Sequence, residues 1–245
     1  MSLFKKSIAS LPLLFCLSQA NAAVVFDFLE LTDTTTGEIT GTMANGTAHT
    51  LGNSGERAFQ SFDWSKGGIN LNASASYTGT NTYSSSYTGA YSSGDTLKAW
   101  AYLDQGNAGL GVCSKGLATQ SSKGTNQCNP GSDDNVTVDE ILELVFNQTV
   151  SIDFSQSTLR NGGHGIYTIP EPYIDISLDG GSNWLVLNRT QTLVSDSFFF
   201  RTNDDNHQFY IDSLAVTAVP EPSVIALLGL GLAGLGFSAR RRLRK

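Results

Sequence analysis

A short acidic stretch contains the residues best suited to binding a metal ion. Within residues 131–140, five side chains offer oxygen ligands, namely Asp133, Asp134, Asn135, Asp139 and Glu140. Calcium prefers such hard oxygen ligands and tolerates the irregular geometry of a loop. The stretch does not match an EF-hand, because neither the glycine nor the final glutamate of that loop falls at the required position. A solvated acidic loop is the simpler interpretation, and a calcium site is the alternative that we keep.

Residues for hydrolytic catalysis are harder to assemble. The three histidines, His49, His164 and His207, are far apart in the sequence, and no Gly-x-Ser-x-Gly nucleophile motif is present. Two carboxylates suited to glycoside hydrolysis could converge in space, but no spacing selects such a pair. We therefore predict that the protein is not an enzyme, with a secreted glycoside hydrolase or lyase kept as a less favoured alternative.

A loosely duplicated polar stretch, residues 76–95, is rich in tyrosine. A tyrosine ring presents an apolar face with a hydroxyl at its rim, which suits contact with sugars. The stretch could therefore form a glycan-binding surface. A polar hairpin at a sheet edge is the simpler interpretation, since the evidence is compositional. The candidate ligand-binding residues are Tyr77, Tyr83, Tyr87 and Tyr91.

Two cysteines, Cys113 and Cys128, flank a stretch rich in Gly, Ser and Thr. In an exported protein, an even pair of cysteines across such a loop indicates a disulfide bond. A metal site built on the two thiolates is the rival interpretation, but no histidine lies nearby to complete it. We therefore predict a disulfide between them.

The charge of the chain is concentrated at its ends. Residues 23–219 contain eight Lys and Arg against 21 Asp and Glu, a net charge of −13. An acidic body of this kind repels phosphate backbones, so nucleic acid is excluded as a partner. Cations, or neutral and cationic polysaccharides, suit it better, although solubility alone is a sufficient explanation.

Short alternating runs of β-branched and aromatic residues, separated by Gly, Asn, Asp and Ser, predict strands without long helices. This pattern favours a single β-sandwich domain of jelly-roll type, spanning residues 23–218. Residues 141–155 are predicted to form two strands joined near residues 147–148. Residues 173–187 are predicted to form a hairpin in which Asp179 caps the turn.

The N-terminus has the pattern of a secretory signal peptide, residues 1–22. Lys5 and Lys6 precede an apolar core, and the sequence Ala-Asn-Ala ends at Ala22. This order of charge, apolar core and small residues predicts cleavage between Ala22 and Ala23 after export by the general secretion machinery.

The last 27 residues combine three features in a fixed order. Pro220, Glu221 and Pro222 are followed by an uncharged stretch, residues 223–239, and then by a basic tail, residues 240–245. At about 1.5 Å per residue, the uncharged stretch is about 25 Å long as a helix, which is close to the minimum that crosses a bilayer. The basic tail would stay cytoplasmic and place the body on the opposite side of the inner membrane. The prolines hold the peptide before this helix extended.

This tail, residues 219–245, resembles the PEP-CTERM sorting signal of Gram-negative bacteria. The resemblance implies recognition by an exosortase, a membrane-embedded cysteine protease that is thought to cut near the motif. Matched to the family pattern, the recognition residues are Pro220, Glu221, Pro222, Arg240, Arg241 and Arg242. Family members are typically surface or extracellular-matrix proteins of organisms that make exopolysaccharide. The body is also similar to β-rich PEP-CTERM ectodomains, a likeness that implies no biochemical role.

Together these features predict an exported, non-enzymatic protein of the cell surface or extracellular matrix. It would be anchored transiently in the inner membrane by its C-terminal helix and then processed by exosortase. No cofactor is required by this function. The alternative is a calcium-assisted module that binds a glycan of the exopolysaccharide or biofilm matrix.

Overall fold

β-Strands are the main secondary structure of the described part of the chain, which contains one short helix. The computed structural model describes residues 22–33, 39–44, 46–50, 56–83, 93–114, 127–128, 133–167 and 173–220. Runs of β-branched and aromatic residues form the strands because such side chains fit a pleated, half-buried surface. The prediction of an all-β fold is confirmed.

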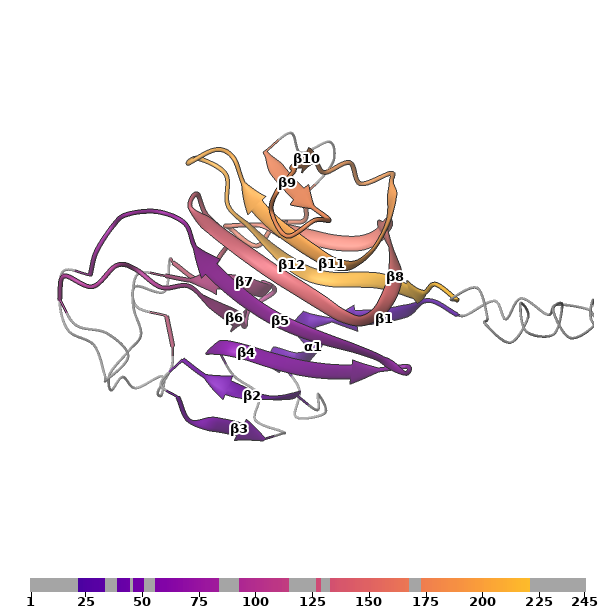
Figure 1. Ribbon diagram of the computed structural model, residues 1–245, viewed down its shortest axis with the longest axis horizontal. Coiled ribbons are helices and arrows are strands. Elements are labelled where there is room, and N and C mark those ends of the chain that lie inside the picture. The colour runs from indigo at the N-terminus through magenta and orange to yellow at the C-terminus, as the bar shows by residue number, and fades with distance from the viewer. Residues whose placement is uncertain are drawn as a thin grey trace, which may run out of the picture. The chain divides into compact units, whose positions relative to one another are not determined.

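Twelve strands and one short helix make up this part (Figure 1). The helix, α1, spans Phe28–Asp33, and the Asp27 carboxylate accepts a hydrogen bond from the Glu30 amide at 2.8 Å, which caps its first turn. The strands are β1 Val24–Asp27, β2 Ile39–Met43, β3 Ala48–Thr50, β4 Arg57–Lys66, β5 Ile69–Tyr77, β6 Trp100–Asp104, β7 Gly109–Cys113, β8 Glu140–Asn161, β9 Ile174–Ser177, β10 Leu185–Val186, β11 Thr192–Thr202 and β12 Phe209–Ala218.

Six of the strands close into a barrel. The ring runs from β4 through β5, β8, β12, β7 and β6 back to β4. The other strands extend this sheet: β1 lies beside β12, β2 and β3 follow β4, and β11, β9 and β10 follow β8. The predicted jelly-roll sandwich is therefore not found, because the described strands form one sheet that closes on itself. An alternation of buried and exposed residues indicates a sheet packed on one face, which both architectures share.

The longest strand, β8, is one continuous element of 22 residues. The predicted turn near residues 147–148 is wrong, because the strand continues through it. The register of the pairing with β11 shifts at this point, because Val145 lies opposite Ser197 whereas Val150 lies opposite Ser195. A bulge of this kind bends a strand without ending it. The first part of β8 can therefore pair with β5 and the later part with β12.

Aromatic side chains connect the strands through one core. Phe26 of β1 meets the Trp64 ring edge-on at 5.1 Å between centroids and the Phe146 ring at 6.0 Å. Phe146 of β8 in turn meets Phe198 of β11 edge-on at 5.9 Å. Such pairs contribute about 0.5–1.5 kcal/mol each beyond the burial of their area. β1, β4, β8 and β11 are therefore packed together as one unit.

The β9–β10 hairpin forms as predicted. Leu185 lies opposite Ile176, and Gly180 and Gly181 adopt the positive φ angles of 72° and 82° that suit glycine in a turn. Asp179 caps this turn: the Asn183 side chain donates to its Oδ2 at 2.6 Å and the Asn183 amide to its Oδ1 at 2.8 Å. These bonds from Asn183 are the main reason that the pKa of Asp179 is lowered to about 2.

The first and last strands of the described part are neighbours. β1 pairs with β12 in antiparallel register, with Val24 opposite Val216. Ala22 and Ala23, the predicted cleavage site, are exposed and come directly before β1. The residues that enter and leave the barrel domain therefore belong to adjacent strands.

The predicted signal peptide and the predicted membrane helix are not among the residues that the structure describes. Residues 1–21 and residues 221–245 lie outside the described residues. Within the described ranges, no helix has the length and hydropathy that a membrane span requires. The signal peptide and the membrane helix at residues 223–239 therefore stay predictions.

Candidate functional site: carboxyl groups beside the disulfide

The disulfide lies on the outer face of β6 and β7. Cys113, the last residue of β7, is bonded to Cys128 as predicted, and their Cα atoms are 5.7 Å apart. Trp100 and Tyr102 of β6 pack with both cysteines in a second, smaller cluster of buried residues. Closing a loop of this length, with a sequence separation of 15, stabilises the fold by about 3 kcal/mol on the chain-entropy model.

The chain after Cys128 covers this outer face. A β-carbon at Gly111 of β7 would lie only 2.1 Å from the backbone oxygen of Asp134, so the close approach needs a glycine. An isolated bridge between Val136 and Phe209 fixes the same segment to the start of β12. Residues 133–136 are all buried as a result.

Under this segment lies a group of polar side chains, here named the covered cluster. Its members are Glu56, Tyr102, Asp104, Asp134 and Tyr210. Tyr102 donates a hydrogen bond to Oε2 of Glu56 at 3.4 Å, and Tyr210 donates one to Oδ1 of Asp134. Burial, followed by the charges of these carboxylates, raises the pKa of both tyrosines. Both hydroxyls therefore remain protonated donors.

Asp104 connects the covered cluster to His164. Burial, then the charges of Asp134 and Glu56, raise the pKa of Asp104 to about 8. Its Oδ2 lies 3.6 Å from Nε2 of His164, and Nδ1 of that ring lies 2.9 Å from the Gly106 oxygen. His164 adopts a φ of 65°, an uncommon conformation for a residue with a side chain. The loop before β9 therefore holds the imidazole against the carboxyl.

A second polar group, here named the Ser114 site, consists of Ser114, Asp133 and Glu140. The Ser114 amide donates to Oδ2 of Asp133 at 3.1 Å, and the Ser114 side chain is hydrogen-bonded to Glu140. Oε2 of Glu140 accepts a hydrogen bond from the Thr137 amide at 2.7 Å, whereas its buried Oε1 has no hydrogen-bond partner among the described residues. Burial, then the charge of Asp133, raises the pKa of Glu140 to about 8.

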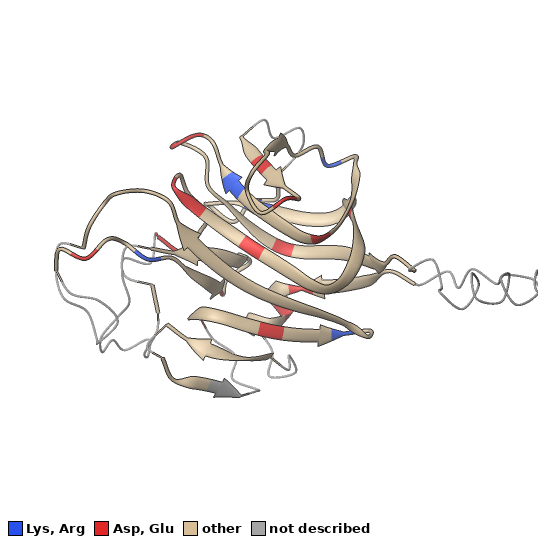
Figure 2. Ribbon diagram, viewed as in Figure 1, with Lys and Arg blue, Asp and Glu red and all other residues tan. Residues whose placement is uncertain are grey.

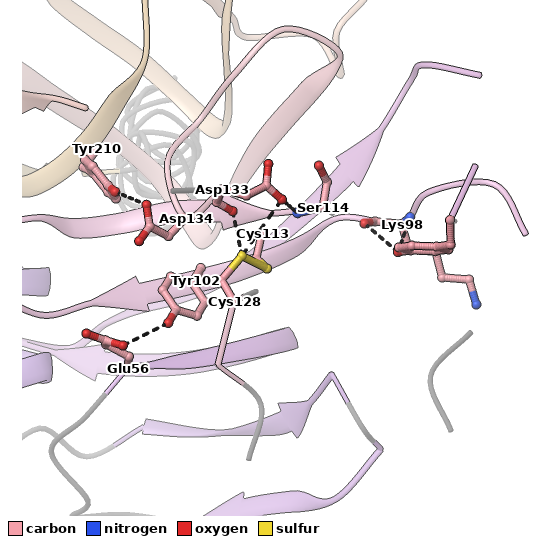
Figure 3. The surroundings of a disulfide bond; sticks show 10 residues. Glu56, Lys98, Tyr102, Cys113, Ser114, Cys128, Asp133, Asp134 and Tyr210 are labelled. Atoms are coloured by element: carbon pink, nitrogen blue, oxygen red, sulfur yellow. Dashed lines mark hydrogen bonds between the residues drawn. A yellow bond between two sulfur atoms is a disulfide. The ribbon is translucent and has the colours of Figure 1, made fainter. Parts of the chain in front are cut away.

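The five predicted calcium ligands do not all point to one place. Figure 3 shows Asp133 turned toward Ser114 and the next side chain, Asp134, turned toward Tyr210. Asn135 is hydrogen-bonded to the Tyr210 hydroxyl and so belongs with Asp134. Glu140 lies with Asp133, and Asp139 is exposed to solvent. The structure therefore divides the predicted set between the covered cluster and the Ser114 site.

The two groups differ in what they can do chemically. The covered cluster pairs its carboxyls with tyrosine hydroxyls and an imidazole, so it can hold or exchange protons. The Ser114 site combines oxygen atoms only, which suits a hard cation. Cys113, Cys128 and Asp133 also have their potential ligand atoms within 4.8 Å of one another. The disulfide uses both sulfurs, so these residues do not form a thiolate metal site.

Sequence reasoning missed most of the covered cluster. Glu56 precedes β4, Asp104 ends β6 and Tyr210 lies in β12, and the strand order β4, β6, β7, β12 in the sheet brings these distant parts of the sequence together. Figure 2 shows acidic residues on many strands and loops, so the composition gives no reason to select these three. The one local signal is the position of Asp104 at the end of β6, a place where strands often give way to functional loops.

Two hollows lie near the end of β5. One, of about 550 Å³, is lined by Tyr77, Lys98 and Trp100, together with residues of β4 and of the turn after β2. The other, of about 370 Å³, is lined by Thr78, Asp139, Trp184 and Arg201 among others. The Arg201 guanidinium lies 4.1 Å from the centroid of the Trp184 ring. Both volumes are large enough for a small ligand.

The predicted tyrosine surface is only partly supported by these positions. Tyr77 lines the larger hollow and accepts a hydrogen bond from the Asn81 side chain at 2.9 Å. Tyr83 is 2% exposed, so its prediction as a surface residue is wrong. Its hydroxyl bonds with the backbone of Lys98, and burial raises its pKa to about 12. Tyr87 and Tyr91 lie outside the described residues.

Comparison with known protein families identifies the end of the chain. Residues 218–242 match the family model of the PEP-CTERM protein-sorting motif. The chain carries a PEP-CTERM sorting signal. This confirms the resemblance seen in the sequence, over about a tenth of the chain.

Neither a curated protein nor a solved structure matches the chain. Of the predicted recognition residues, Pro220 is exposed after β12, and the others lie outside the described residues.

Proposed function

We propose that this protein is an exported β-barrel domain that exosortase sorts and processes to the cell surface or extracellular matrix. The observation that carries the proposal is the PEP-CTERM match at residues 218–242. On this view the barrel is the cargo and performs no catalysis. The signal peptide directs export, and the helix at residues 223–239 holds the protein temporarily in the inner membrane.

The position of the motif supports this order of events. The last backbone hydrogen bond of the barrel joins the Val219 amide to the Thr149 oxygen at 3.0 Å. Pro220, the next residue, is exposed. A protease that grips an extended peptide would thus meet the motif at the first residue beyond the sheet. Cleavage on the C-terminal side of Pro220 would leave every strand intact.

The N-terminal end of the domain and the disulfide are both consistent with export. Ala22 and Ala23 are exposed directly before β1, so signal peptide cleavage there removes no residue of the fold. The Cys113–Cys128 disulfide fits the oxidising compartments outside the cytoplasm. Localisation outside the inner membrane is therefore part of the proposal.

Replacement of Pro220, Glu221 and Pro222 by alanine tests the sorting function. In a host that has an exosortase, the variant is expected to stay in the membrane fraction with the mass of an uncut C-terminus. The second Pro-Glu-Pro sequence, residues 170–172, provides a matched control. Its replacement by alanine should leave sorting unchanged. Normal sorting of the first variant would contradict the proposal.

The hollow beside Tyr77 supports glycan binding as a second candidate function. An aromatic residue, Tyr77, and a basic residue, Lys98, both line this cavity of about 550 Å³. A glycan array, read with and without a calcium chelator, tests this function. Tyr77→Ala should abolish binding, whereas Tyr173→Ala, a change at a tyrosine stacked on His207, should not. Arrays without signal in either condition would exclude it.

A further inference from the structure

The hollow lined by Thr78, Asp139, Trp184 and Arg201, here named the Arg201 hollow, is not used by either function proposed above. It lies directly after β5 and beside the start of β8, the β9–β10 loop and the end of β11. We propose that it continues the hollow beside Tyr77, here named the Tyr77 hollow, and that the two together hold one chain of uncharged sugar units. This inference rests on the glycan-binding candidate function, to which it adds the charge and the length of the ligand.

The two hollows are adjacent to each other. Tyr77 lines one of them, and the next residue, Thr78, lines the other. A β-carbon at Gly79 would lie 2.4 Å from the Tyr77 hydroxyl and 2.7 Å from Oδ2 of Asp139. This hydroxyl and this carboxylate are therefore neighbours, although their residues line different hollows. A chain that leaves the Tyr77 hollow beside the tyrosine can enter the Arg201 hollow beside Asp139.

Arg201 provides a hydrogen-bond donor that is already held in place. Its Nε and Nη2 donate to Oδ2 of Asp175 at 3.2 Å and 3.1 Å, and its guanidinium lies 4.1 Å from the centroid of the Trp184 ring. Nη1 has no hydrogen bond within the described part of the chain. The Arg201 side chain is 38% exposed, against 9% for Asp175. A fixed donor loses little freedom on binding, so Nη1 suits a ligand hydroxyl.

Asp139 provides the matching acceptor. Its backbone oxygen accepts hydrogen bonds from the Thr78 amide at 2.8 Å and from the Thr78 hydroxyl at 3.1 Å, which hold the residue at a φ of 68°. The residue is exposed, and no hydrogen bond among the described residues uses its carboxylate. The Arg201 hollow therefore presents one free donor group and one free acceptor group.

Trp184 adds an apolar contact to this pair. Asn183, the residue before it, is bonded to Asp179 through both its amide and its side chain, so the loop that carries the indole is fixed. The ring is partly exposed and lines the hollow. A sugar unit has hydroxyls that both donate and accept, and an apolar ring face that can contact an aromatic side chain. The three side chains together match these properties.

The charges along the two hollows favour an uncharged ligand. Arg201 forms an ion pair with Asp175, and the exposed Asp139 of one hollow is balanced by the exposed Lys98 of the other. Glu140 also lines the Arg201 hollow, but it is only 1% exposed. Neither an anionic nor a cationic ligand would therefore gain from a large net charge of opposite sign.

The test is calorimetric titration of the disulfide-bonded full chain with neutral oligosaccharides. Glucose-, mannose- and galactose-based series, each from disaccharide to hexasaccharide, are the probes, and the detergent must lack a sugar headgroup. The hexasaccharide of the series that binds is expected to bind at least about tenfold more tightly than its disaccharide, because it reaches both hollows. Arg201→Lys keeps the positive charge but loses Nη1 and the planar group, and it should weaken hexasaccharide binding at least about tenfold.

Asp139→Asn is a second variant at an exposed position that tolerates a positive φ. It should weaken hexasaccharide binding about fivefold, the difference between a charged and a neutral acceptor. Asp205→Asn is the matched control, because it also removes one charge from an exposed residue, and it should bind like the wild type. If Arg201→Lys does not fold, the Asp139→Asn result decides.

The outcomes separate this inference from the function on which it rests. Equal affinity for disaccharide and hexasaccharide, or a hexasaccharide affinity that neither variant lowers, would overturn the two-hollow site and leave glycan binding at Tyr77 intact. Tighter binding of a uronic acid or amino sugar series would overturn the assignment of an uncharged ligand. If none of the neutral series binds, both this inference and the glycan-binding function are wrong, whereas the sorting function is unaffected.

Discussion

The buried carboxyl of Asp104 makes the stability of the domain depend on pH in an unusual direction. In the fold its pKa is raised to about 8, whereas in the unfolded chain a carboxyl of this type titrates near pH ~4. Between these values the folded state binds a proton that the unfolded state does not. The stabilising effect of this proton is complete below pH ~4 and is lost as the pH rises toward 8.

The size of the effect follows from proton linkage. One extra proton in the folded state lowers the free energy of unfolding by at most about 1.4 kcal/mol for each pH unit upward. From pH 5 to pH 7 the contribution of Asp104 is therefore at most about 2.7 kcal/mol. Asp104→Asn removes the titrating group but keeps the shape of the side chain. Relative to the wild type, this variant should become more stable as the pH rises.

Urea unfolding of the wild type and of Asp104→Asn at pH 5, 6, 7 and 8 measures this difference. Asp205→Asn, a change at an exposed carboxyl on the loop before β12, is the control and should follow the wild type at every pH. The refuting result is a constant difference between the wild type and Asp104→Asn over the whole range. Such parallel curves would mean that Asp104 is ionised in the fold.

Three further predictions concern stability. Changing both Cys113 and Cys128 to serine should lower the free energy of unfolding by about 3 kcal/mol, and reductant should then have no further effect on a denaturant curve. Gly111→Ala should destabilise the domain and expose the covering segment to limited proteolysis, because its β-carbon would collide with the Asp134 backbone; an unaltered cleavage pattern would contradict this packing. Phe62→Ala, which empties a fully buried position of β4, should cost about 3–5 kcal/mol in calorimetry, and a loss under 1 kcal/mol would argue against the core described above.

Local features of the fold could be predicted from the sequence because local residues determine them. Asp179 and the two glycines after it define their own turn, and the hairpin follows. Predicting the pairing of Cys113 with Cys128 needed only the expected signal peptide and the absence of other cysteines after residue 22. The sorting signal could be recognised for the same reason, since its three parts are contiguous.

Features that depend on closure of the sheet could not be predicted. Alternation shows which side chains point inward, but it does not show whether the sheet closes on itself or packs against another. Polar residues 147–148 suggested a turn, yet β8 passes through them as a bulge, because β5, β11 and β12 pair along its length. Asp133 and Asp134 looked like equivalent ligands, but Asp133 bonds to the Ser114 amide and Asp134 to the Tyr210 hydroxyl.

The mass of the mature protein isolated from an exosortase-containing host tests the central claim most directly. The account predicts a chain that begins at Ala23 and ends before the membrane helix, with the disulfide intact. A native protein at its final location that still ends at Lys245 would contradict it.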